Sequence, residues 1–150
     1  MSGSVAPVGE PRFVRLGIRF SAPPERTYAA WADPENLHRW FPHEIRGSLA
    51  PGTRSELVWP DQSTWWEVEA AESGRRFVFR WPWLADDSYV TRVEVRLTAE
   101  GYGTRLALED GPFDLSVPGV LDAYVKASAG WGEALAHLKG YLDYSVDLRR

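Results

Sequence analysis

The chain has 150 residues, a formal net charge of −4 at pH 7 and no cysteine. This length fits one domain with a single core. The missing thiols exclude disulfides, iron–sulfur ligation, thiol nucleophiles and zinc sites built on thiolates. The acidic balance argues against a nucleic-acid partner, because phosphate binding needs a concentrated basic surface. With eight Trp, six Tyr and six Phe, the chain has more aromatic surface than its core needs, and part of it is expected to line a cavity.

No apolar run reaches the length of a membrane helix. The opening residues lack the basic patch and apolar core of a secretion signal. We therefore expect a disordered tail over residues 1–12, one domain over residues 13–150 and a cytoplasmic location.

The first part of the chain is predicted to form a strand followed by two short helices. Residues 13–20 alternate apolar and polar side chains, which predicts a half-buried strand. Prolines at the first helical positions predict short helices over residues 25–32 and 35–40, and Asp33 can cap the second. The side chains expected to point inward after this cap are Leu37, Trp40 and Phe41.

Residues 44–110 keep a period of two almost throughout, which predicts strands joined by hairpins. The expected strands cover residues 44–49, 53–59, 64–71, 76–83, 89–98 and 104–109. The side chains assigned to the inner face are Trp66, Val68, Ala70, Phe77, Phe79, Trp81, Val93, Val95, Leu97, Leu106 and Leu108. Acids and arginines at the alternate positions predict cross-strand ion pairs on a solvated outer face. They include Glu67, Glu69, Arg80, Arg92 and Arg96.

The last stretch, from Pro118 to about Tyr144, repeats apolar residues every three or four positions, as an amphipathic helix does. The stripe expected to face the core is Leu121, Tyr124, Val125, Ser128, Trp131, Leu135, Leu138 and Leu142. The polar face expected in water is Asp122, Lys126, Glu133, Lys139 and Asp143. An antiparallel sheet followed by such a helix predicts an α+β fold in which the helix covers the concave side of the sheet.

Several segments carry a resemblance. The stretch FSAPPERTYAAWADPENLHRWF at residues 20–41, RRFVFRW at 75–81, GTRLAL at 103–108 and the pair Gly130-Trp131 resemble the bacterial family similar to the activator of the heat-shock-protein-90 ATPase. This family belongs to the START-like (SRPBCC) superfamily. The resemblance implies a helix-grip fold, with a curved antiparallel sheet around the terminal helix and a largely apolar cavity between them. Superfamily members bind lipids, hormones or polyketides there.

The aromatic residues that converge on the space between sheet and helix form the candidate ligand site. Together with two hydroxyl residues they are Trp40, Phe41, Trp59, Trp66, Phe79, Trp81, Tyr124, Ser128 and Trp131. The alternative is that these rings pack only against one another as core. Ser128 is the one serine expected to face the cavity, and no histidine is expected beside it. The three histidines are expected outside the cavity and too badly spaced for a metal site: His38, His43 and His137.

The function that these observations favour is binding of a hydrophobic or lipid-like small molecule, without catalysis, cofactor or metal. A chaperone-accessory module that binds a protein partner, with the link to stress response that the family's name implies, is the alternative. A cyclase or hydrolase acting on a hydrophobic substrate is a third, which a buried histidine or carboxylate in the cavity with a perturbed pKa would favour. The oligomeric state stays open, with a dimer as one possibility.

Overall fold

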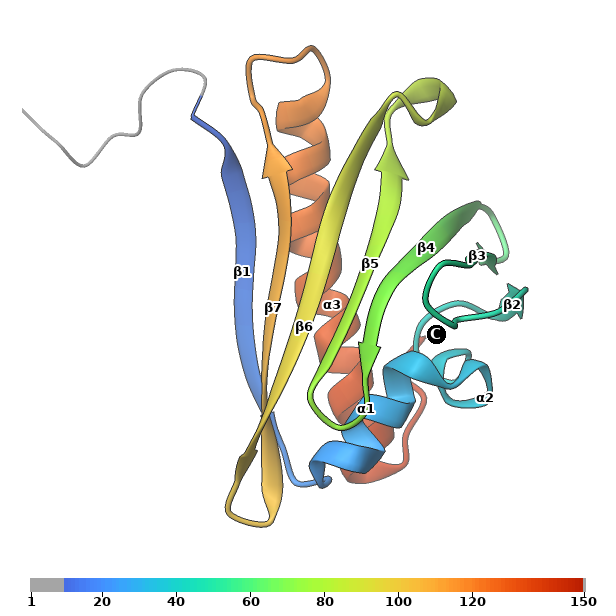
Figure 1. The fold of residues 1–150 in the computed structure, drawn as a ribbon, viewed down its shortest axis with the longest axis vertical. Coiled ribbons are helices and arrows are strands. Elements are labelled where there is room, and N and C mark those ends of the chain that lie inside the picture. Colours follow the sequence, from blue (N-terminus) through green and yellow to red (C-terminus); the bar gives the residue numbers. More distant parts are fainter. Residues whose placement is uncertain (1–9, 150) are drawn as a thin grey trace, which may run out of the picture.

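The computed structural model describes residues 10–149. Within this range seven strands form one antiparallel sheet in the order β1-β7-β6-β5-β4-β3-β2, and the long helix α3 packs across one face of it (Figure 1). The strands are β1 (Arg12–Phe20), β2 (Glu44–Arg46), β3 (Arg54–Val58), β4 (Ser63–Glu72), β5 (Arg76–Trp83), β6 (Tyr89–Glu100) and β7 (Gly103–Phe113). The helices are α1 (Pro24–Ala32), α2 (Pro34–Leu37), the short 3-10 turn η1 (Ala85–Asp87) and α3 (Val120–Tyr144). The predicted α+β helix-grip architecture is confirmed.

Element ends differ from prediction in a few places. Residues 1–9 of the expected tail lie outside the described residues, and Arg12 already belongs to β1. The Asp33 carboxylate caps α2 as predicted, accepting the backbone N–H of Glu35 at 3.0 Å. The helix ends at Leu37 instead of continuing to residue 40. Trp40 is nevertheless buried, and its indole N–H donates to the carbonyl of Ala30 at 2.9 Å.

The strand register contains one irregularity that alternation did not predict. The pairing of β4 with β5 shifts between Val68 and Ala70, so Ala71 pairs with Phe77 and packs on the core. Ala70 instead pairs with Val78, and its predicted inward position is wrong. A bulge inserts one unpaired residue, and every later side chain changes face.

The predicted core stripe of α3 is confirmed in the second half of the helix, at Trp131, Leu135, Leu138 and Leu142, and is wrong in the first half. The buried residues of the helix are Val120, Ala123, Ala127, Trp131, Ala134, Leu135, Gly140, Leu138 and Leu142. Leu121 and Val125, predicted to face the core, are each 57% exposed. Alanines occupy the contact positions because small side chains let a helix and a sheet pack closely.

The far end of α3 is also less solvated than predicted. The Asp143 side chain is only 4% exposed and lies 2.8 Å from the Lys139 ammonium. Both carboxylate oxygens accept the backbone N–H of Ser21 at 3.0 Å. Lys139 also donates to the carbonyl of Arg19 at 2.6 Å. Two polar residues assigned to the water-facing side therefore join α3 to the end of β1.

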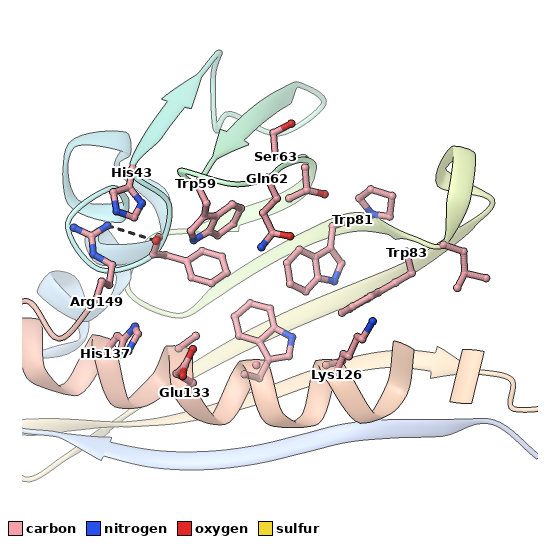
Figure 2. A pocket seen from close by; sticks show the side chains of 18 of the residues that line it. His43, Trp59, Gln62, Ser63, Trp81, Trp83, Lys126, Glu133, His137 and Arg149 are labelled. Carbon is pink, nitrogen blue, oxygen red and sulfur yellow. Dashed lines mark hydrogen bonds between the residues drawn. The ribbon is translucent and has the colours of Figure 1, made fainter. Parts of the chain in front are cut away.

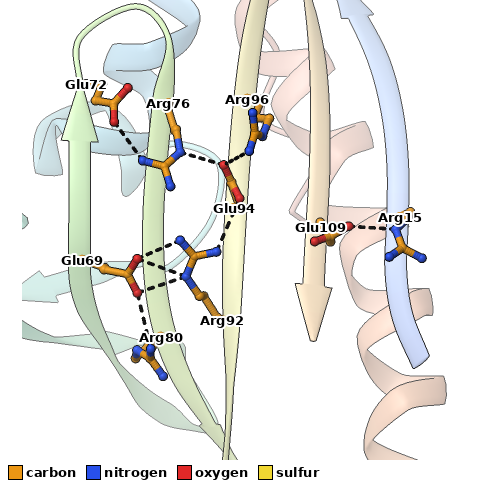
Figure 3. Close-up of polar contacts among 9 residues, drawn as sticks. All are labelled: Arg15, Glu69, Glu72, Arg76, Arg80, Arg92, Glu94, Arg96 and Glu109. Carbon is orange, nitrogen blue, oxygen red and sulfur yellow. Dashed lines mark hydrogen bonds and ion pairs between the residues drawn. The ribbon is translucent and has the colours of Figure 1, made fainter. Parts of the chain in front are cut away.

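The outer face of the sheet carries the predicted ion pairs (Figure 3). Glu94, whose side chain is 11% exposed, accepts a hydrogen bond from Arg76 Nε at 2.7 Å and forms an ion pair with Arg96 Nη2 at 2.8 Å. Burial opposes ionisation of Glu94, but the hydrogen bond from Arg76 and the surrounding guanidinium charges outweigh it and lower its pKa. Glu69 Oε2 forms an ion pair with Arg92 Nη2 at 2.7 Å. The three arginines predicted on this face all lie there in ion pairs: Arg80, Arg92 and Arg96.

Candidate binding pocket

A pocket of about 850 Å³ lies between α3, the end of β5 and the segments around residues 41–43 and 59–64 (Figure 2). Its aromatic walls are Phe41, Trp59, Trp81, Trp83 and Trp131. Its polar lining residues are His43, Gln62, Ser63, Thr64, Asp87, Lys126, Glu133, His137 and Arg149. The cavity therefore offers both aromatic ring faces and polar groups to a small molecule.

Small residues on α3 create the floor of the pocket. Ala127, Gly130 and Ala134 line it one helical turn apart, where larger side chains would fill the space. A Cβ built on Gly130 meets no atom within 4 Å, and the same holds at Gly132, which does not line the pocket. The two glycines around Trp131 therefore reflect open space beside the helix and no close approach of another backbone.

A buried carboxylate behind the wall fixes the orientation of its indoles. Asp110, on β7, is 0% exposed. Its Oδ2 accepts the indole N–H of Trp131 at 2.9 Å and that of Trp81 at 3.3 Å. Trp83 is anchored in the same way, since its N–H donates to the Thr91 hydroxyl at 2.8 Å. Three pocket indoles thus have their N–H edges tied to the strands behind them.

Burial has the largest effect on the pKa of the Asp110 carboxyl. It raises the pKa of this carboxyl to about 6, while the Thr91 hydroxyl and the indoles of Trp131 and Trp81 act in the opposite direction. Asp110 is not among the pocket-lining residues, so it supports the wall without facing the cavity. The sequence contained a signal for it, because Asp110 continues the inward alternation of Leu106 and Leu108 on the same strand.

The chain after α3 closes one end of the pocket. Arg149 Nη1 donates to the carbonyls of His38 at 2.8 Å, Pro42 at 3.0 Å and Phe41 at 3.4 Å. Because this segment carries both Phe41 and His43, Arg149 holds two pocket-lining side chains in place.

The predicted site residues fall into three groups. Those that line the pocket are Phe41, Trp59, Trp81 and Trp131. Those buried in the adjoining core are Trp40, Trp66 and Phe79, the last two stacked at 3.7 Å between ring centroids. Tyr124 and Ser128 lie away from the pocket, with the Tyr124 ring 5.5 Å from Phe113 and the Ser128 hydroxyl donating to the Tyr124 carbonyl at 2.9 Å. Ligand contact by any of the nine stays a prediction.

Two histidines predicted outside the cavity line it instead. His43 lies two residues after Phe41, and His137 lies on α3 between the buried Leu135 and Leu138. Figure 2 shows His137 and Glu133 rising from α3 on the same side. Glu133 and Lys126, predicted to face water, are exposed as predicted and also line the pocket. Among residues 10–149, no group of three or more acidic or histidine side chains is arranged to hold a metal ion.

The sequence profile of the family described as "Activator of Hsp90 ATPase homolog 1-like protein" matches residues 21–143. The chain belongs to this family. The predicted membership is confirmed, and the match covers both the sheet and α3. No curated protein matches the chain.

Several solved structures are similar to this chain. Protein MLL2253 from Mesorhizobium loti is 25% identical, with a TM-score of 0.78 over 90% of this chain and 99% of that chain. CalU16 from Micromonospora echinospora is 27% identical, with a TM-score of 0.70 over 93% of this chain and 82% of that chain. The Aha1 dimer from Colwellia psychrerythraea shares the fold at 16% identity, with a TM-score of 0.77 over 89% of this chain and 97% of that chain.

One further structural finding concerns membranes. Across the described part of the chain, none of the helices is both long and apolar enough to pass through a bilayer.

Proposed function

We propose that this protein binds an apolar, ring-containing small molecule in the pocket between the sheet and α3. The observation that carries the proposal is the aromatic-walled cavity of about 850 Å³, a volume within the range of about 300–1,000 Å³ typical of ligand sites. The anchoring of Trp81 and Trp131 on Asp110 supports it further, since pre-organised walls reduce the entropy lost on binding.

Two glycines on α3 provide a matched test. Gly130→Phe adds a ring where the structure has open space within the pocket, and Gly132→Phe adds the same ring at an equally open position outside it. Both changes replace a mid-helix glycine, which favours the helix by roughly 0.5 kcal/mol, so both variants are expected to fold.

Binding is measured with N-phenyl-1-naphthylamine, a neutral apolar dye that fluoresces in apolar surroundings. We expect the unmodified protein and Gly132→Phe to bind it with similar affinity, and Gly130→Phe to lose at least about tenfold, because the added ring occupies the volume that the dye needs. Equal binding by all three proteins would place the dye elsewhere and remove the support for a pocket ligand.

A chaperone-accessory role is the second candidate. The family's description and the exposed side chains of Leu121 and Val125, one turn apart on α3, support it. The sequence reasoning found no exposed apolar pair on this helix. Leu121→Asp with Val125→Lys would abolish binding to an Hsp90-type chaperone if this surface is the contact. Tyr102→Asp, at an exposed residue outside α3, is the control. Retention of the interaction by the double variant would exclude the surface.

An enzymatic role has less support. The one described carboxyl whose pKa is raised into the neutral range, Asp110, lies behind the pocket wall. A cytoplasmic location, lipid as the ligand and a link to the stress response remain predictions of the sequence.

A further inference from the structure

The chain after α3 folds back along the end of the helix. Ser145 takes a left-handed backbone conformation, with a φ of 54°, and the N–H of Val146 donates to the carbonyl of Gly140 at 3.0 Å. A left-handed residue at the end of a helix reverses the direction of the chain. Residues 145–149, which we call the strap, therefore run back toward α2 (Figure 1).

The strap lies directly on the backbone of α3, and Gly140 is the residue that allows this contact. A Cβ built on Gly140 would stand 2.8 Å from Leu148 Cδ1 and 3.3 Å from the carbonyl oxygen of Val146. The first distance is shorter than any van der Waals contact between carbon atoms. A side chain at residue 140 would therefore displace Leu148 from the helix.

Two strap residues, Leu148 and Arg149, line the pocket. Arg149 fastens the strap to the opposite wall (Figure 2): its side chain is only 14% exposed and donates to the three carbonyls within residues 38–42 described above. Leu148 supplies an apolar surface to the pocket, yet 48% of this residue remains exposed. A ligand in the pocket would meet this exposed part.

The position of the strap is weakly determined by the protein alone. Residues 145–148 are all exposed, so most of the strap faces water. Short exposed segments open locally at a low free-energy cost. An apolar ligand that covers Leu148 buries apolar surface only while the strap is docked, and this burial favours the docked form. Docking of the strap and binding of the ligand therefore strengthen one another.

We propose that the strap is a movable wall of the pocket, which closes on an apolar, ring-containing ligand through Leu148 and is fastened by Arg149. The contact between Leu148 and the ligand couples the two events. This inference rests on the proposed function and adds to it a ligand-contact residue and a closing step.

Two glycines of α3 separate strap docking from other effects. Gly140→Ala places a Cβ against Leu148, whereas Gly132→Ala adds the same methyl group in open space. Neither glycine lines the pocket, so neither change alters a direct contact with a ligand. Alanine favours a helix more than glycine does at both positions, and both variants are expected to fold.

Binding is measured with N-phenyl-1-naphthylamine. We expect Gly132→Ala to bind the dye like the unmodified protein and Gly140→Ala to lose about three- to fivefold, the effect of leaving half of a leucine side chain uncovered. Leu148→Ser should lose a similar factor. Val146→Ser is its control, because Val146 is 45% exposed on the same strap but does not line the pocket, and it should bind normally.

Hydrogen exchange at the Val146 amide, which donates to Gly140 in the docked strap, measures the reverse effect by NMR. We expect saturating dye to slow this exchange about threefold in the unmodified protein, because the coupling of two equilibria is reciprocal. The Tyr102 amide, in the exposed turn between β6 and β7, should not respond. In Gly140→Ala the Val146 amide should exchange faster, and the dye should slow it less.

The outcomes distinguish this inference from the proposed function. If Gly130→Phe abolishes dye binding but Leu148→Ser binds as tightly as Val146→Ser, the pocket remains a binding site and the strap is not part of it. Saturating dye that leaves the exchange of the Val146 amide unchanged would likewise overturn the closing step. If the dye binds to none of these proteins, both proposals fail.

Discussion

Replacing Asp110 by Asn tests the description of the pocket wall most directly. The variant keeps the shape of the side chain and an acceptor for an indole N–H, but it cannot ionise. In the folded protein burial raises the pKa of Asp110 from 3.8 to about 6, against the hydrogen bonds from Thr91, Trp131 and Trp81. Between these two pH values the folded protein holds a proton that the unfolded chain has released. The free energy of unfolding must therefore fall as the pH rises through this window.

The magnitude follows from the two pKa values. The difference of about two pH units between 3.8 and 6 corresponds to about 3 kcal/mol over the whole window. The part that falls between pH 5 and pH 7 is about 1 kcal/mol. The wild-type protein should thus gain about 1 kcal/mol more stability than Asp110→Asn when the pH is lowered from 7 to 5.

Urea unfolding at pH 5, 6 and 7, followed by tryptophan fluorescence, measures this difference. The histidines occur in both proteins, so their titration cancels in the comparison. Glu94, whose pKa is lowered by Arg76 and its neighbours against the effect of burial, stays ionised across the range and adds no slope. Parallel pH profiles for the two proteins would refute the assignment of a desolvated, titrating carboxyl at Asp110.

Two other substitutions test the structure around the pocket and the outer face. Glu94→Gln should lower the free energy of unfolding by about 2 kcal/mol at pH 7, because it leaves Arg76 and its neighbours without their buried acceptor. Urea titration measures this loss, which should shrink as the pH falls through the pKa of Glu94, held below its ordinary value by the neighbouring arginines. A neutral effect at pH 7 would mean that the pairs are fully solvated. Arg149→Ala should speed amide hydrogen exchange in residues 38–43 by releasing the carbonyls of His38 and Pro42. Arg149→Lys should recover part of the protection, and unchanged exchange would show that other contacts hold this segment.

Local signals were sufficient for most of the fold. Alternation predicted the strand Arg76–Trp83 with its observed bounds, and two prolines with Asp33 predicted the order of α1 and α2. The errors lie where pairing with a neighbouring strand decides the outcome. The bulge after Val68 is set by the register with β5, and β7 continues to Phe113 because β1 and β6 extend beside it. A single strand carries no information about the length of its neighbours.

The composition of the pocket depended on one quantity that the sequence of α3 leaves undetermined, the rotation of the helix about its axis. Ranking leucine above alanine turns Leu121 and Val125 inward, about one residue or roughly 100° from the orientation of the first half of the helix, whereas the second half faces the core as predicted. The sheet sets the true rotation. The Trp131 indole N–H donates to Asp110, and the alanines on either side of it, Ala127 and Ala134, are buried. Glu133 and His137 flank the buried residues of the second half of the helix and line the cavity from there. The polar character of the site is therefore a consequence of packing between two layers, and a buried aspartate on β7, some twenty residues away in sequence, decides which residues of α3 a ligand would meet.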